Sequence, residues 1–260
     1  MIDIHNHIIP GVDDGATSLE MAMDMGRMAE KEGITKMIAT PHHHPEDPDF
    51  SRKIRGAVKA LNLNFRKEGL SLRLYPGAEA MLSPVLLKEV KEKRVLTLND
   101  SDYLLVEFPF FEEPLHMDEV LYQLRSEGLK PVIAHPERYR SVRENPDQVR
   151  QWILKGSYMQ VNHTSILGVM GKSVQKTARH LLTHHMVHFL GSDSHSNGRR
   201  RPYGKTVIKQ LEQWISKEEI QRLMMNGEAL LEKKSIEEKD PVQFPKAYPF
   251  LEKVKQGLFL

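Results

Sequence analysis

The first residues of the chain place two histidines and two carboxylates within one short segment. In the stretch MIDIHNHIIPGVDDG, one residue separates His5 from His7, and Asp13 and Asp14 follow in a turn-rich loop. Alternate residues of a strand point to the same side of it, so the two imidazoles can face one point. Imidazole and carboxylate groups are common ligands of divalent metals. The segment therefore predicts the first ligands of a metal centre, although spacing alone does not distinguish Asp13 from Asp14.

Residues of the same kinds occur at or just after the ends of further short apolar segments. They are His42, Glu79, Glu107, His135, Asn162, Asp193 and His195. One histidine at the end of a strand is more often structural, and an HxH pair alone is a weak signal. The recurrence of such residues at the ends of seven segments in a row indicates a metal site. Its donors are nitrogen and oxygen without sulfur, which suits manganese, iron, zinc or cobalt, and their number indicates more than one ion.

The segments that position these residues recur at a spacing of roughly thirty residues, the length of one βα unit. Seven apolar or β-branched runs are candidate strands, at 1–5, 36–40, 72–77, 103–108, 131–135, 158–162 and 187–193. Strands that alternate with helices favour a parallel sheet. In a parallel barrel the C-terminal ends of all strands lie on one face, where loops build the active site. We therefore predict an α/β protein, a single-domain TIM-like barrel with seven βα units, with the candidate ligands on that face.

Helix signals lie between the candidate strands. Thr17-Ser18-Leu19-Glu20 has the pattern of a capping box, and Gly33 is expected to end the helix that follows. Ser83-Pro84 and Asn145-Pro146 each place a capping residue before a proline at the first helical position. One or two further helices are expected after the last strand, through about residue 233.

No linker divides this part of the chain, so we predict one domain over 1–235 and a C-terminal extension over 236–260. The extension contains three prolines and several aromatic residues. It is expected to pack on its own domain, on a neighbouring subunit or on a partner. The sequence leaves the oligomeric state open.

Composition limits the classes of function. The 260 residues contain no cysteine, which excludes disulfides, cysteine-ligated zinc and a cysteine nucleophile. The net charge of +2 does not indicate a general nucleic-acid binder. We find neither the pattern of a signal peptide nor an apolar run approaching the roughly 18 residues that would span a membrane. A cytoplasmic location is therefore expected.

These motifs together resemble those of the PHP (polymerase and histidinol phosphatase) superfamily. Within it, the chain is similar to the bacterial manganese-dependent tyrosine-protein phosphatases of capsule and exopolysaccharide systems, the CpsB/CapC type. The resemblance covers nearly all of 1–232 and rests on DIHNHIIPGVDDG, ATPHH, PGAE, VEFP, VIAHPERY, QVN and GSDSH. It implies a distorted (β/α)7 barrel, the PHP fold, that holds three metal ions, with manganese as the expected metal.

The resemblance also implies which residues hold each ion. The first metal is expected on His5, His7, Glu79 and Asp193. The second is expected on Glu79, Glu107 and His135, so that Glu79 bridges two ions. The third is expected on Asp14, His42 and His195, where the choice of Asp14 over Asp13 follows the VDDG pattern of the family.

Two arginines are expected to bind the substrate phosphate, because a planar guanidinium suits two parallel hydrogen bonds to phosphate oxygens. One is Arg138 in HPERY. The family places the second after the DxH motif, just before a proline. Here three arginines stand in a row in GRRRP, and we choose Arg201, which precedes Pro202, with Arg200 as the alternative.

The implied activity is hydrolysis of phosphotyrosine by a metal-activated water, in one step and without a phosphoenzyme. The implied substrate is the tyrosine-rich tail of a cognate bacterial tyrosine kinase that controls synthesis of a surface polysaccharide. The nearest alternative is a histidinol-phosphate phosphatase of the same superfamily. A non-catalytic metal-binding protein is the alternative of another class, although structural sites are usually single and closed. A nuclease is disfavoured, since no basic groove with interleaved aromatic residues is visible.

Overall fold

The computed structural model describes residues 1–111 and 116–243. Within these ranges every paired strand is parallel to its neighbour. The first sheet has the order β1 (Ile2–Asn6), β2 (Lys36–Ala39) and β3 (Arg73–Pro76). The second has the order β4 (Glu79–Met81), β5 (Tyr103–Glu107), β6 (Lys130–Ala134), β7 (Tyr158–Asn162) and β8 (Phe189–Gly191). The parallel α/β class predicted from the sequence is confirmed.

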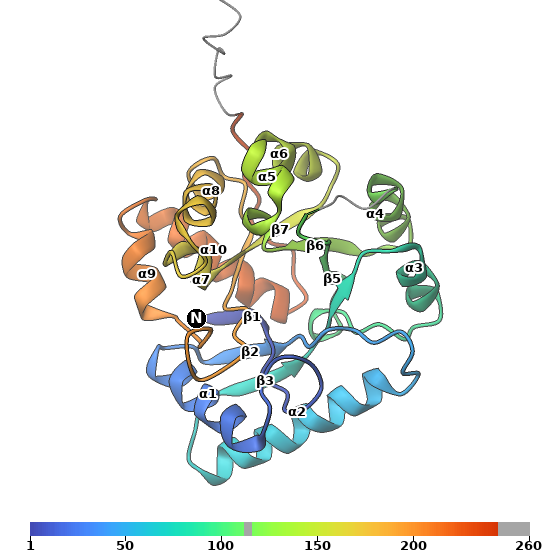
Figure 1. Ribbon diagram of the computed structural model, residues 1–260, viewed down its shortest axis with the longest axis vertical. Coiled ribbons are helices and arrows are strands. Elements are labelled where there is room, and N and C mark those ends of the chain that lie inside the picture. Colours follow the sequence, from blue (N-terminus) through green and yellow to red (C-terminus); the bar gives the residue numbers. More distant parts are fainter. Residues whose placement is uncertain (112–115, 244–260) are drawn as a thin grey trace, which may run out of the picture.

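Helices connect the strands and surround them, as Figure 1 shows. The longer ones are α1 (Leu19–Lys31), α2 (Phe50–Lys67), α3 (Pro84–Lys91), α4 (Met117–Ser126), α6 (Asp147–Leu154), α8 (Lys172–Thr183) and α10 (Lys217–Leu231). The shorter ones are α5 (Arg140–Glu144), α7 (His163–Ile166), α9 (Lys205–Leu211) and the 3-10 turns η1 (Leu98–Asp100) and η2 (Pro136–Arg138). None of the helices in the described ranges is long and apolar enough to cross a membrane.

The third candidate strand, 72–77, contains β3, and an additional short strand follows it in the second sheet. β3 ends at Pro76, and the chain then crosses to the second sheet, where β4 begins at Glu79. The crossing is tight, because a Cβ atom at Gly77 would lie 2.8 Å from Cγ2 of Ile38. The Glu79 N–H donates to the carbonyl of Pro41 at 3.1 Å, so β4 starts beside the chain that leaves β2. The sequence pattern did not predict β4, since three residues are too few to show a period.

The two sheets also meet between the first and the last strand. The His7 N–H donates to the Ser194 carbonyl at 2.9 Å, and the Asp193 N–H donates to the His5 carbonyl at 2.8 Å. The described strands thus form two sheets joined by isolated bridges, not one continuously hydrogen-bonded sheet. Side chains of both sheets nevertheless share one buried apolar cluster, which includes Ile4, Ile38, Leu105, Val132 and Phe189.

Local signals account for several of the helix ends. Ser18, one residue later than the predicted box would place the cap, accepts from the Met21 N–H at 3.2 Å and begins α1. Gly33 follows the end of that helix with a φ of +79°, a backbone conformation that favours glycine. Ser83 caps α3, with Pro84 in its first turn, as predicted. The prediction for Asn145 was wrong: α6 begins at Asp147, and no side chain caps it.

The described part of the C-terminal extension packs on its own domain. The Glu237 backbone exchanges two hydrogen bonds with the Asn226 side chain of α10, at 2.9 and 3.0 Å. The Tyr158 hydroxyl donates to Glu238, and Val242 N–H donates to the His184 carbonyl. The remainder of the predicted extension, 244–260, lies outside the described residues.

Candidate metal centre

The structure brings all nine predicted ligands to the C-terminal ends of the strands. They form four overlapping groups, in each of which the candidate ligand atoms lie within 4.8 Å of one another. The groups are His5, His7 and Asp193; His5, Glu79 and His135; His42, Glu79 and Glu107; and His7, Asp14, His42 and His195. Most of these side chains are buried, whereas Asp14, which is 67% exposed, lies at the outer edge. The cluster is therefore largely buried, and Asp14 and His42 are its most exposed members.

Glu79 lies at the centre of the cluster. Its Oε2 is 3.1 Å from Nε2 of His5 and 3.3 Å from Nε2 of His7, and its Oε1 is 3.0 Å from Nε2 of His135. Burial opposes ionisation of this carboxyl, but His5 and the hydrogen bonds from the surrounding rings hold its pKa well below the usual value. Because its two oxygens face different histidines, Glu79 is placed to bridge two cations.

Asp193 occupies the other side of the same space. Its Oδ1 is 3.6 Å from Nε2 of His5 and 3.5 Å from Nε2 of His7. Burial again opposes ionisation, yet His5 and Arg200 lower the pKa of Asp193 far below its ordinary value. Four groups, two imidazoles and two carboxylates, thus converge on one buried point.

A chain of buried amides determines which nitrogen of His5 faces that point. The Asp193 carboxylate only accepts, so the Asn162 amide nitrogen must donate to it, at 2.7 Å. The Asn162 oxygen then accepts from the Gln160 amide nitrogen at 2.9 Å, and the Gln160 oxygen, 2.7 Å from Nδ1 of His5, accepts from that ring. Nδ1 of His5 therefore carries the hydrogen, and its Nε2 presents a lone pair to the cluster.

Asp13 has the corresponding role for His7. Its Oδ2 is 2.7 Å from Nδ1 of His7 and accepts from the His42 N–H, while its Oδ1 accepts from the Gly15 N–H. The structure thus separates the two adjacent aspartates: Asp13 orients a ring from behind, and Asp14 faces His42 and His195 at 3.6 and 3.3 Å. The choice of Asp14 as the candidate ligand fits this geometry.

These contacts test whether the residues suit a metal. In both His5 and His7, Nδ1 donates to an oxygen, so Nε2 of each neutral ring is an acceptor. These two acceptor nitrogens nevertheless lie only 3.2 Å apart. The position strongly favours positive charge, because Asp13 and Glu79 raise the pKa of His7 to about 10 although burial opposes this. A proton satisfies one pair of acceptors, whereas several converging nitrogen and oxygen acceptors suit multivalent cations. The donor set therefore fits divalent metal ions.

Two arginines contact the cluster, and one of them differs from the sequence-based choice. Nη1 of Arg138 donates to Oδ2 of Asp193 at 2.9 Å, as expected for a group beside the centre. Nη2 of Arg200 lies 3.0 Å from the same oxygen. Arg201 instead lies over the ring of Tyr203, 4.9 Å from its centroid.

The loop backbone explains why Arg200, and not Arg201, contacts the cluster. The Arg200 carbonyl accepts from the N–H groups of His195 and Ser196, at 2.9 and 3.2 Å. This turn directs Arg200 back toward the cluster and Arg201 away from it. Arg201 was chosen because it precedes Pro202, and that position in the sequence carries no information about the turn.

A second layer of polar residues was not singled out from the sequence. Asp3 is fully buried and joins two ligand-bearing segments: its Oδ1 accepts from the N–H groups of His5 and Ser192, and its Oδ2 accepts from the Ser192 hydroxyl. Gln160 belongs to the same layer. A sequence signal could have found both residues. Asp3 stands two positions before His5, and Gln160 two positions before Asn162, so on a buried strand each shares a face with that residue.

Replacing Gln160 by leucine is expected to weaken manganese binding about 10- to 100-fold, the usual effect of losing a partner of a metal-ligating histidine. The change leaves His5 Nδ1 and the Asn162 oxygen without their partner while nearly conserving volume. Calorimetric titration with Mn²⁺ measures the effect directly. Gln151→Leu, on the exposed surface of α6, is the matched control. Equal affinities of the two variants would show that the amide chain does not orient His5.

One family model and several named proteins are similar to this chain. A family model described as capsular polysaccharide synthesis, CpsB/CapC, matches residues 1–232. The tyrosine-protein phosphatase YwqE of Bacillus subtilis is 35% identical over 245 residues, which cover 93% of this chain and 95% of YwqE. The tyrosine-protein phosphatase CpsB of Streptococcus agalactiae serotype III is 29% identical over 243 residues, covering 89% of this chain and 98% of CpsB.

A solved structure of a similar protein has the same fold as this chain. It comes from a study of YwqE from Bacillus subtilis and CpsB from Streptococcus pneumoniae, described as metal-dependent tyrosine phosphatases. The two folds match with a TM-score of 0.90 at 34% sequence identity. The match covers 95% of this chain and 100% of the other.

Proposed function

The chain belongs to the CpsB/CapC family of capsular polysaccharide synthesis. From this premise we propose that it is a metal-dependent protein-tyrosine phosphatase, the activity for which its relatives are named. One observation carries the proposal: the cluster of candidate ligands includes Asp193, and two guanidinium groups contact that carboxylate. Metal ligands beside arginines suit a phosphate monoester, whose charged oxygens accept strong hydrogen bonds.

We propose three divalent ions, with manganese as the physiological metal. The first would be held by His5, His7, Glu79 and Asp193, the second by Glu79, Glu107 and His135, and the third by Asp14, His42 and His195. The four overlapping groups of ligand atoms support this division. When bound, such ions lower the pKa of a coordinated water and stabilise charge on phosphate oxygens.

The arginines of the chain would hold and orient the phosphate. Arg138 donates to Oδ2 of Asp193, and Arg200 forms an ion pair with the same oxygen and donates to the Asp193 carbonyl. Both guanidinium groups have further N–H groups for a ligand. The Arg138 guanidinium lies 4.3 Å from the centroid of the Phe110 ring, which restricts its movement. We infer that Arg138 and Arg200, not Arg201, are the phosphate-binding pair.

Phe110 favours an aryl ester over an alkyl one. Its ring lies beside both Arg138 and the His135 ring, 5.5 Å from the centroid of the latter. An apolar ring beside the phosphate-binding groups suits the phenyl ring of phosphotyrosine better than the polar, cationic histidinol phosphate. A phenolate, with a pKa of about 10, leaves without a strong general acid. The chain contains no cysteine to form a thiophosphate, so hydrolysis in one step by water is proposed.

We further propose that the substrate is a phosphotyrosine-bearing tail of a bacterial tyrosine kinase that regulates capsule synthesis. The family description supports the link to capsule, and the names of the relatives support phosphotyrosine. We also propose that the two parallel sheets act as one distorted (β/α)7 barrel, since their strands share a buried cluster. The cytoplasmic location and the division into 1–235 and 236–260 stay predictions.

Removal of metal tests the proposed function. Protein treated with chelator is expected to lose at least about 100-fold of its turnover of a phosphotyrosyl peptide and to regain it with Mn²⁺, because no other group of the site supplies the nucleophile. Histidinol phosphate is assayed in parallel. Preferential turnover of histidinol phosphate would reassign the protein within its superfamily, and turnover of neither substrate by metal-loaded protein would favour a binding role.

A further inference from the structure

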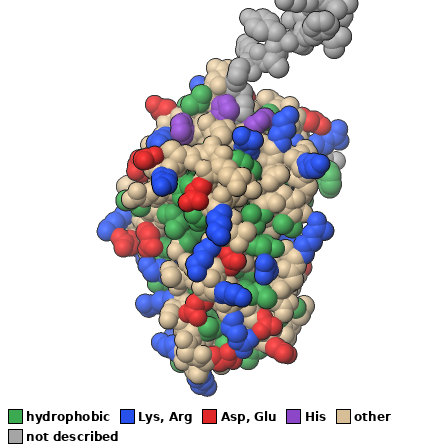
Figure 2. Space-filling view, turned by 90° about the vertical axis from the view of Figure 1, so that its left-hand side faces the viewer, with side chains coloured by type: hydrophobic (Ala, Val, Ile, Leu, Met, Phe, Trp, Pro, Cys, Tyr) green, Lys and Arg blue, Asp and Glu red, His purple; other side chains and the backbone are tan. Residues whose placement is uncertain are grey.

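Basic residues are concentrated in one segment of the chain. Residues 163–211 contain eight lysines and arginines and a single carboxylate, Asp193, which belongs to the metal centre. The chain as a whole has a net charge of only +2, so the remainder is net negative. This segment forms α7, α8, β8 and α9. Figure 2 shows the side of the molecule on which α8 and α9 lie; Lys and Arg side chains run down the middle of this face, with acidic ones beside them.

A hollow of about 780 Å³ lies on this side, between α8 and the chain around α9. Its lining includes Lys172, Lys176 and Arg179, which face it at helical spacing, and no aspartate or glutamate. Among the described residues, none of these three cations forms an ion pair. The Arg179 guanidinium lies 5.8 Å from the centroid of Trp214, which forms an apolar wall. We call this hollow the α8 groove.

The helix that lines the α8 groove lies next to the segments that carry the proposed phosphate-binding arginines. Helix α8 packs against η2, the turn that contains Arg138. Just before α8, the Val169 carbonyl accepts a hydrogen bond of 2.7 Å from Arg199, the residue that precedes Arg200. Lys172 begins the helix at this end. The line of cations therefore starts near the metal centre and leads away from it along the outer surface.

We propose that the α8 groove binds an acidic segment of the protein substrate next to its phosphotyrosine, an inference that rests on the proposed phosphatase function. Arg179 lies seven positions after Lys172, about 10 Å along a helix axis. Three residues of an extended peptide span about the same length. A run of about three carboxylates beside the phosphotyrosine therefore equals the three cations of the α8 groove in number and spans about the same length.

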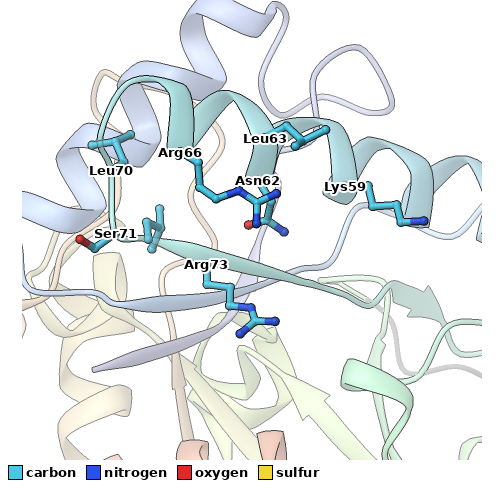
Figure 3. A pocket seen from close by; sticks show the side chains of 8 residues that line it. Lys59, Asn62, Leu63, Arg66, Leu70, Ser71 and Arg73 are labelled. Carbon is cyan, nitrogen blue, oxygen red and sulfur yellow. The ribbon is translucent and has the colours of Figure 1, made fainter.

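A second basic hollow lies too far away for this role. It lies between α2 and β3 and is lined in part by Lys59, Arg66 and Arg73, as Figure 3 shows. Arg73 begins β3, whereas the metal centre lies at the C-terminal ends of the strands. A peptide held at the metal centre does not reach the opposite end of the sheet. These three residues therefore provide a control with the same change of charge.

The test compares three phosphotyrosyl peptides that carry three aspartates, three asparagines or three lysines on each side of the phosphotyrosine. We expect the manganese-loaded protein to prefer the acidic over the neutral peptide by about tenfold in kcat/KM, mainly through KM, from three modest surface ion pairs. The preference should fall as salt screens the charges. The triple variant Lys172→Glu/Lys176→Glu/Arg179→Glu should reverse the order and prefer the lysine peptide.

Reversal is the decisive result, because a disturbed fold lowers turnover of every peptide and does not exchange their order. The control Lys59→Glu/Arg66→Glu/Arg73→Glu should keep the wild-type order. Equal turnover of the three peptides by wild-type protein, or an unreversed order in the α8 variant, would overturn the proposal while leaving the phosphatase function intact. Binding to phosphatidylserine vesicles that depends on the α8 cations, without peptide preference, would assign them to a membrane surface instead. Failure to hydrolyse p-nitrophenyl phosphate or any peptide would instead reject the phosphatase function.

Discussion

Replacing Glu79 by glutamine is expected to lower manganese-dependent hydrolysis of a phosphotyrosyl peptide by about 10³-fold or more, roughly 4 kcal/mol of transition-state stabilisation. The two oxygens of Glu79 contact different histidines, His5 and His7 on one side and His135 on the other. An amide has one oxygen and no charge, so it cannot bridge two cations in this position. We expect the variant to bind fewer ions as well as to react more slowly.

Metal content and turnover of the Glu79 variant should be measured on the same preparation. Glu46→Gln is a matched control, because Glu46 is exposed and pairs only with His44 among the described residues. It should keep both the metal content and the rate of the parent protein. Full metal content in Glu79→Gln, with unchanged turnover, would contradict a bridging role.

Replacing Arg200 by alanine is expected to lower kcat/KM for the same peptide by about 10²-fold, roughly 2.7 kcal/mol. Nη2 of Arg200 lies 3.0 Å from Oδ2 of Asp193, so the guanidinium lies beside the candidate metal centre, where we propose that the phosphate binds. Arg201→Ala should change kcat/KM by less than about twofold, because Arg201 lies on Tyr203, away from the centre. Both variants should be assayed at saturating manganese.

The adjacent residue thus provides the control for the Arg200 experiment. The two substitutions remove the same charge from neighbouring positions of one loop. A larger loss in Arg201→Ala than in Arg200→Ala would mean that the loop takes another course when substrate binds, and it would restore the sequence-based choice.

The convergence of the candidate ligands could be predicted from the sequence because a simple topological rule brings them together. Strands of a parallel α/β fold share one direction, so residues as far apart as His5 and Asp193 meet if each follows its own strand. Residue type and position relative to the strand therefore indicated a common site, whereas the choice of Asp14 over Asp13 came from the family resemblance. Seven of the eight strands were recognised because each carries a run of apolar residues between helix signals, whereas β4 is too short to show one.

Features that depend on the course of a loop could not be predicted in the same way. The turn that selects Arg200 depends on hydrogen bonds from His195 and Ser196 to one carbonyl, and three identical side chains give no sign of it. The different roles of Asp13 and Asp14 likewise depend on the course of their loop, which places Asp13 behind the His7 ring and Asp14 beside His42 and His195. The crossing at Gly77 depends on the lack of space beside Ile38, a tertiary contact that no local pattern records.

The meeting of β1 and β8 has a consequence for how the protein is made. The buried hydrogen bonds from Ser192 to Asp3 join residues 189 positions apart. At a synthesis rate of about 5–20 residues per second, the first strand leaves the ribosome roughly 10–40 s before its last partner exists. Contacts of such long range also slow folding. The metal centre is therefore among the last parts of the molecule to form, and a nascent chain that ends before β8 has no catalytic activity.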